Sequence, residues 1–229
     1  LDMAISYEAL LPEILPMVSG CPDLLIENSV RASAIEFCER TGAYQIEMDP
    51  ITTVANSYEY DLEAPTGTTV HKIMWVTFEG NDLEPVSTTV LEQRKPKWRE
   101  TGYTGTPDLY VHQSTNTVWL VPVPNTTSSG STIVRAQMKP THTSTGCDEQ
   151  IMNEHRDAVV NGALFRLLRM PGRDWSDISG AQIYGGLFGE AVVNAERRAR
   201  HADEGVVWRV NYGGIGRTKR FKRYGRERG

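Results

Sequence analysis

The sequence predicts an α+β protein in which helices from both ends of the chain form a bundle and a large β-rich insert lies between them. Two observations support this prediction: apolar residues recur at helical spacing near both ends, and the spacing changes to an alternation of two in the middle. A third observation is the strongly basic segment 206–229, which we expect to be an extended tail. With 229 residues, the chain is long enough to bury a substantial core.

Two helices are expected in the first 43 residues. Ser6 can cap a short helix through YEALLPEILPMV, which two prolines limit in length and kink. The second helix is expected over 23–41, because apolar residues recur there at helical spacing and Gly42 provides a C-terminal stop. Its apolar positions are Ile26, Val30, Ala34, Phe37 and Cys38.

Between residues 44 and 146 the pattern indicates strands. The runs YQIEM, VHKIMWVTFEG, TVWLVPV and STIVRAQMK are rich in β-branched and aromatic residues, and turn residues separate them. Residues 114–116 are the best candidate for a hairpin turn, and 88–94 are typical of a short helix. The Ser, Thr and Gly run at 126–132 is expected to be a flexible loop.

Helical spacing returns after Cys147. One helix is expected from Asp148, its N-cap, to about Met170, and its apolar positions cover more than one face, which favours a central position. The last helix is expected over 179–202. Small residues make one of its sides suited to close packing: Gly180, Ala181, Gly185, Gly186, Gly189, Ala191 and Ala195.

Charge divides the chain into an acidic body and a basic end. Eight of the 24 Lys and Arg residues and one of the 29 Asp and Glu residues fall in 206–229, so this segment carries +7 and the first 205 residues carry −12. Such asymmetry is typical of a docking tail, although a solvated end is the alternative interpretation. The candidate docking residues are Trp208, Arg209, Tyr212, Arg217, Lys219, Arg220, Phe221, Lys222, Arg223 and Tyr224.

The sequence offers no recognisable catalytic, cofactor or metal-binding motif. Its five His and three Cys residues are scattered, and neither GxSxG nor GxxxxGK[ST] occurs. No apolar run approaches the ~20 residues of a membrane span, and the N-terminus lacks a signal-peptide core. We therefore expect no enzyme activity, no cofactor, no metal and no membrane partner, with free thiols in a reducing compartment.

The segment CPDLLIENSVRASAIEFCERT, the long β insert and the last helix with its NAERRAR end before a basic tail resemble the head-to-tail adaptor (connector) proteins of tailed bacteriophages. The resemblance implies a homo-oligomeric, twelve-fold ring at the virion neck, assembled in the host cytoplasm. In such a ring, 1–43 and 147–205 would form the helical body and 44–146 the insert. Residues 206–229 would dock on the portal protein, the other face would receive a tail or nozzle protein, and genomic DNA would pass through the channel.

Two other functions are open from the sequence. A nucleic-acid-binding protein would place the cations of 206–229 on phosphates and its aromatic residues on bases, but the acidic body opposes this for the chain as a whole. A cell-wall hydrolase of the virion would need two carboxylates about 5–10 Å apart, which the sequence neither shows nor excludes. The structural adaptor is the leading hypothesis.

Overall fold

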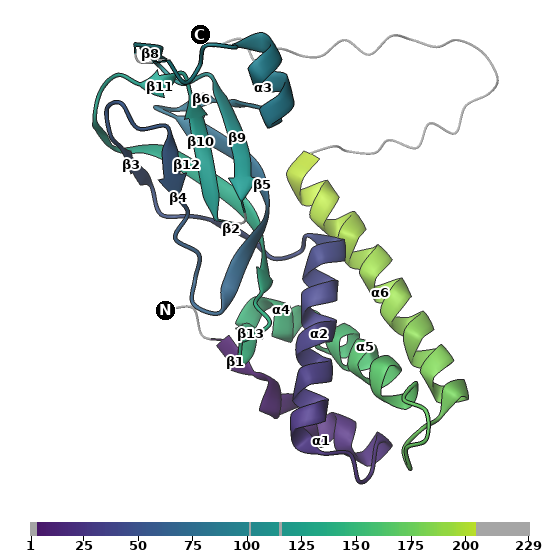
Figure 1. Ribbon diagram of the computed structural model, residues 1–229. Helices are drawn as coiled ribbons and strands as arrows, with labels where there is room; N and C mark the ends of the chain where they lie inside the picture. Colours follow the sequence, from purple (N-terminus) through teal and green to yellow (C-terminus); the bar gives the residue numbers. More distant parts are fainter. Residues whose placement is uncertain (1–3, 101, 115, 205–229) are drawn as a thin grey trace, which may run out of the picture.

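The computed structural model describes residues 4–100, 102–114 and 116–204, and it is elongated, with helices at one end and sheets at the other (Figure 1). The mixed α/β composition expected from the sequence is confirmed. The helices of the described residues are α1 (Leu11–Ile14), α2 (Asp23–Thr41), α3 (Thr88–Arg94), α4 (Glu149–Glu154), α5 (Arg156–Leu168) and α6 (Ile178–Glu204).

Most strands lie between α2 and α4. They are β1 (Ala4–Ser6), β2 (Gln45–Glu47), β3 (Ile51–Thr53), β4 (Glu59–Asp61), β5 (Thr68–Phe78), β6 (Asn81–Asp82), β7 (Glu84–Pro85), β8 (Thr104–Gly105), β9 (Leu109–Ser114), β10 (Thr117–Val121), β11 (Val123–Pro124), β12 (Ser128–Pro140) and β13 (Gly146–Asp148).

The longest strands, β5 and β12, pair antiparallel at the centre of one sheet, with β2 and β3 on the other side of β12 and β6 beside β5. A second sheet has the order β4-β10-β9-β7, and two short pairs, β1 with β13 and β8 with β11, complete the described strands. The hairpin expected around 114–116 is confirmed, because β9 and β10 pair antiparallel on either side of it, with Trp119 opposite Val111.

The ends of α2 and α3 follow from local chemistry. Gly42 has φ 59°, a left-handed conformation suited to glycine, and its N–H donates to the Cys38 carbonyl, so α2 ends at the expected stop. Ser87 caps α3 by accepting a hydrogen bond from the Val90 N–H at 3.3 Å. Both helices occupy the ranges expected from the sequence.

Two expectations were wrong. Residues 126–132 were expected to be a loop, but β12 begins at Ser128, where a hydroxyl contact of 2.9 Å between Thr53 and Ser131 holds the strand beside β3. The single helix expected over 148–170 is two, α4 and α5, because His155 leaves the helical conformation (φ −127°, ψ 23°). The expected cap is present, since the Asp148 carboxylate accepts the Gln150 N–H.

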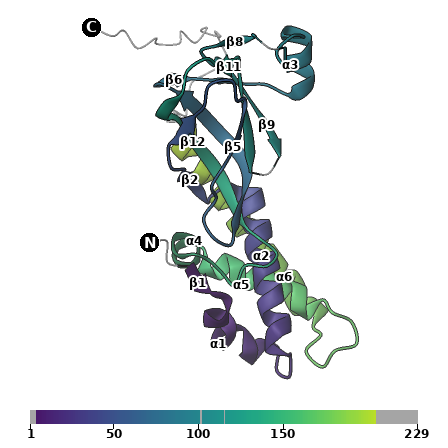
Figure 2. The same cartoon turned by 60° about the vertical axis from the view of Figure 1, so that its left-hand side comes forward.

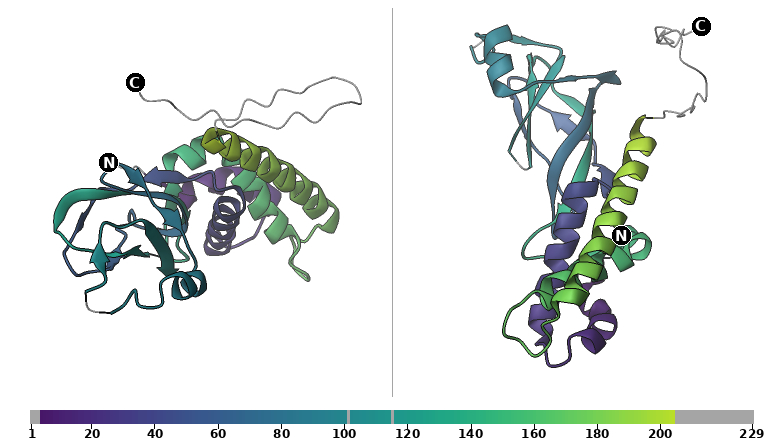
Figure 3. Two further views of the ribbon diagram at one scale, coloured as in Figure 1. Left: turned by 90° about the horizontal axis from the view of Figure 1, so that it is seen from above. Right: turned by 90° about the vertical axis from the view of Figure 1, so that its right-hand side faces the viewer.

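The long helices α2, α5 and α6 meet at Gly162 of α5. A Cβ at this position would collide with the Ser33 hydroxyl oxygen of α2 and lie 2.9 Å from the Phe188 ring of α6. Ser33 is fully buried, and its hydroxyl donates to the Val159 carbonyl at 2.8 Å. Only a glycine allows three helices to approach this closely. Seen from above, in the left panel of Figure 3, α2 is nearly end-on and α6 runs obliquely past it.

The helices share one hydrophobic core with the sheet of β5 and β12. Phe37 from α2, Leu167 from α5, Val76 from β5 and Met138 from β12 belong to the same buried cluster. A second, smaller cluster lies near α3, at the end of the β-rich part that is farther from the helices (Figure 2). The elongated shape therefore rests on a core that is continuous from the helices into the first sheet.

We expect Gly162→Ala to lower the free energy of unfolding by about 1–3 kcal/mol, because the added methyl overpacks the contact with Ser33 and Phe188. Gly186→Ala in α6 is the matched control, since its methyl would meet no atom within 4 Å. It should raise stability by up to about 1 kcal/mol through helix propensity. Chemical denaturation measures both, and equal effects would contradict the packing described for Gly162.

His155 should make stability fall at acid pH. Burial lowers its pKa, and Arg198 lowers it further while Glu154 opposes the shift. The folded state therefore favours the neutral ring, so stability is lost as pH falls through the unfolded-state value of about 6.5. We expect the free energy of unfolding to decrease more between about pH 7 and pH 5 in the wild type than in His155→Gln. Parallel pH profiles for the two proteins would show that His155 titrates normally.

Candidate partner-binding surfaces

The ten docking residues expected from the sequence, from Trp208 to Tyr224, lie outside the described residues. The segment that contains them follows α6. This helix reaches Glu204 at its end nearer the sheets, whereas Ile178, its first residue, lies at the opposite end of the helical part (Figure 1).

That opposite end carries exposed apolar side chains. Of the seven large apolar side chains most exposed among the described residues, five belong to α1–α2 or to the first half of α6, with exposed fractions between 45% and 66%: Met17, Leu24, Ile178, Ile183 and Leu187. Exposed apolar residues gathered in one region mark contact surfaces in soluble proteins. This apolar end is a candidate partner-binding surface.

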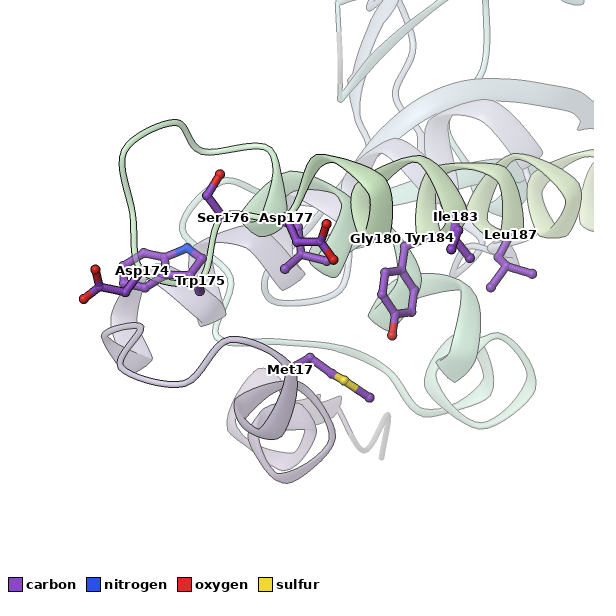
Figure 4. A pocket seen from close by; sticks show the side chains of 10 residues that line it. Met17, Asp174, Trp175, Ser176, Asp177, Gly180, Ile183, Tyr184 and Leu187 are labelled. Atoms are coloured by element: carbon purple, nitrogen blue, oxygen red, sulfur yellow. The ribbon is translucent and has the colours of Figure 1, made fainter.

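A groove of about 590 Å³ opens at the apolar end (Figure 4). α6 contributes Ile183, Tyr184 and Leu187 along one wall, and the loop before α6 contributes Trp175. Met17 approaches from the 3₁₀ turn that follows α1, at Leu15–Met17. The groove therefore joins segments from the N-terminal and C-terminal parts of the chain, and its lining combines apolar and aromatic side chains with about as much polar surface.

Two carboxylates, Asp174 and Asp177, stand at the same groove. Asp177 accepts the Ser179 N–H at 3.0 Å and so caps the first turn of α6. Neither carboxylate forms an ion pair with any described residue. The nearest described cation in sequence, Arg173, lies over the Trp175 ring at 5.9 Å from its centroid. The groove thus combines apolar and aromatic side chains with two acids that form no ion pair with the described residues.

A cluster of aromatic side chains, separate from the groove, forms the smaller core near α3. Trp98 is 1% exposed and Trp119 is 8% exposed, and Tyr58 meets both rings edge-on, with centroid distances of 5.3 and 5.6 Å. The Arg99 guanidinium covers both indoles, 4.6 Å from the centroid of Trp98 and 5.5 Å from that of Trp119. Leu91 of α3 belongs to the same cluster. We interpret this arrangement as packing that holds α3 on the second sheet.

No other described group suggests chemistry. The described residues contain no group of three or more His, Cys, Asp and Glu side chains that could hold a metal ion. Cys21, Cys38 and Cys147 are free and buried, and a hydrogen bond with Cys147 together with burial raises the pKa of the Cys38 thiol. A raised pKa keeps a thiol protonated and unreactive. Over the same described residues, no helix is long and apolar enough to cross a membrane.

Residues 10–210 match the SU10 adaptor protein family. The chain belongs to this family. The resemblance to head-to-tail adaptors of phages is thereby confirmed. The match extends from the start of the helical part through both sheets and α6, and it includes Trp208 and Arg209 of the expected docking residues. The other eight lie beyond the matched residues. A comparison with curated proteins gives no match.

The sequence pattern missed the apolar end. Small residues on α6 were expected to pack closely, and this holds for Gly185, whose Cβ would lie 2.8 Å from the Phe165 ring. It does not hold for Gly186 and Gly189, which face open space. The available signal was that α6 is apolar on two sides: Phe188 is 4% exposed, whereas Ile183 is 64% exposed. Spacing alone does not tell which side is covered.

Ile183→Gln should leave the free energy of unfolding within about 0.5 kcal/mol of the wild type, because this exposed side chain contributes little to folding. Phe188→Ala, five residues along the same helix, should cost about 3–5 kcal/mol through the cavity it leaves. Denaturant titration of the two variants distinguishes the faces. A large loss for Ile183→Gln would place that residue in the core rather than on a partner surface.

Proposed function

We propose that the protein is a structural adaptor at the neck of a bacteriophage virion, where copies of it form a twelve-fold ring between the portal and the tail. The observation that carries the proposal is the family match over residues 10–210. In this ring, 1–43 and 147–205 form the body, 44–146 form the insert and 206–229 form the portal-docking tail. Assembly takes place in the host cytoplasm.

The two chemically different ends of the helical part support this proposal. An adaptor must contact one partner on each side, so it needs two distinct surfaces on a body that keeps them apart. The basic segment continues from Glu204 at one end of α6, and the apolar end lies at the other. At ~1.5 Å per residue, the 27 residues of α6 separate these ends by roughly 40 Å. We assign the basic segment to the portal and the apolar end to neighbouring subunits or the tail-side protein.

The acidic body suits a ring that surrounds DNA. The first 205 residues carry −12, and a negatively charged channel wall does not adhere to phosphates, so genomic DNA can pass. We propose no catalytic step, cofactor, metal or membrane contact for this role. The protein acts through its surfaces.

A second candidate function is nucleic-acid binding by the tail alone. The charge of +7 on 206–229, interleaved with Trp208, Tyr212, Phe221 and Tyr224, favours it, because cations contact phosphates and aromatic rings stack on bases. This function and portal docking use the same residues. They predict different behaviour when the segment is removed.

Removal of 206–229 is the decisive test. If the tail docks on the portal, the truncated protein should keep the circular dichroism spectrum and melting curve of its body and lose stable binding to purified portal, measured by co-sedimentation. If the tail binds nucleic acid instead, portal binding should survive and a steeply salt-dependent affinity for DNA should disappear. A truncated protein that keeps both bindings would refute both roles.

Point variants separate steering from anchoring. Reversing the charges of Arg217, Lys219, Arg220, Lys222 and Arg223 should slow association with the portal and change its salt dependence, because these cations act at long range. Trp208→Ala should mainly speed dissociation, since aromatic anchors hold the complex together. Surface plasmon resonance reads both rates, and the same change in both variants would contradict the division of roles.

A further inference from the structure

We propose that, before the portal is bound, the groove between α6 and Met17 holds the basic segment 206–229 of the same chain as a latch. The contact is inferred from the lining of the groove and from the sequence of the segment. Its regulatory meaning, that the latch delays portal docking until the ring is in place, rests on the proposed function. The occupant is identified by charge, by aromatic content and by reach.

The groove and the segment are chemically complementary. The groove offers the apolar side chains of Met17, Ile183 and Leu187 and the carboxylates of Asp174 and Asp177, which form no ion pair with described residues. The segment offers aromatic residues among cations, and no other stretch of this chain combines the two so densely. Apolar burial together with charge pairing at an edge is how short basic segments bind acidic grooves.

Charge alone would select a different site. A second acidic pocket of about 310 Å³ lies in the β-rich part and carries Asp49, Asp61 and Glu63. Of its apolar residues, Met48 and Leu62 are only 5% and 3% exposed, Ile51 is half-buried and Pro50 is exposed. The groove exposes Met17, Ile183 and Leu187 at 45% or more, so an incoming aromatic ring would bury less apolar surface in this acidic pocket than in the groove. The groove at α6 has two acids but exposed apolar walls. This difference makes the acidic pocket an internal control.

The length of the segment fits the distance. From Glu204 back to Ile183 the axis of α6 covers 21 residues, or roughly 32 Å at ~1.5 Å per residue. An extended chain covers this in about ten residues at ~3.3 Å each. Residues from about 214 onward can therefore reach the groove, which includes Lys219, Phe221 and Lys222. The basic turns near the C-terminal end of α6, with Arg197 and Arg198, repel the segment from the nearer part of the helix.

A latch of this kind lowers the apparent affinity for the portal. If the tail is held for most of the time, only the released fraction can dock, and the apparent dissociation constant rises in proportion. A subunit that already sits beside the portal overcomes this through high local concentration, whereas a free subunit does not. The latch would thus favour docking at the assembly site over docking in solution.

Carbodiimide coupling tests the contact on the full-length protein. This reagent joins an amine to a carboxylate only where the two are paired, and peptide mass spectrometry locates the bond. We expect Lys219 or Lys222 to couple to Asp174 or Asp177. With a mixture of isotope-labelled and unlabelled protein, the coupled peptides should carry a single label state, because the contact is within one chain.

Matched variants give the control. The double variant Ile183→Gln/Leu187→Gln removes the apolar wall without adding charge, and it should abolish the coupling. If the latch is closed about nine-tenths of the time, the double variant should also raise the apparent affinity for the portal roughly tenfold. Val54→Gln changes an exposed apolar residue of the β-rich part, 51% exposed, and should change neither. Asp174→Asn with Asp177→Asn should remove the coupling while an Asn at 177 keeps the helix cap.

Each of the other possible outcomes would contradict one part of the latch proposal. Coupling of the tail lysines to Asp49, Asp61 or Glu63 would show that charge alone decides the site. Peptides of mixed label would make the occupant a second copy. Absence of coupling in a protein whose tail is needed for portal docking would refute the latch and leave the adaptor function intact. Coupling as expected, in a protein that binds the portal without its tail, would refute the portal role and leave the contact intact.

Discussion

The close contact of α2, α5 and α6 at Gly162 determines how the three long helices pack. Ser33 and Phe188 occupy the space that a side chain at 162 would take, and the buried hydroxyl of Ser33 is satisfied by the Val159 carbonyl. The contact joins one N-terminal and two C-terminal helices, so it packs together the segments that precede and follow the β-rich part. It also fixes the direction of α6 along the body, and thereby the positions of both of its ends.

The direction of α6 separates two chemically different regions of the molecule. Its first turns present Ile183 and Leu187 at the apolar end, and its last described residue, Glu204, stands at the end from which the basic segment continues. The core shared by the helices and the sheet of β5 and β12 makes the β-rich part an extension of this body. The described residues expose apolar side chains at one end of the helical part, which is consistent with membership of an adaptor family.

Local signals predicted most of the fold. α2 ends where Gly42 permits a left-handed turn, and α3 begins after Ser87, whose side chain caps it. The break at His155 has neither glycine nor proline to announce it, and the start of β12 depends on a contact between Thr53 and Ser131 that is remote in sequence. The spacing of apolar residues did not predict the apolar end, since exposed and buried apolar residues alternate along α6. Long-range contacts and unoccupied surfaces are what a periodic pattern does not contain.

An electron microscopy map of the protein bound to its portal would show whether the helical part lies between two partners, with a different partner at each of its chemically different ends. We expect a closed ring in which the Glu204 end of α6 faces the portal and the end with Met17 and Ile183 lies in contacts between subunits or with the tail-side protein. A ring with α6 reversed, or subunits bound to the portal through Met17 and Ile183, would contradict it.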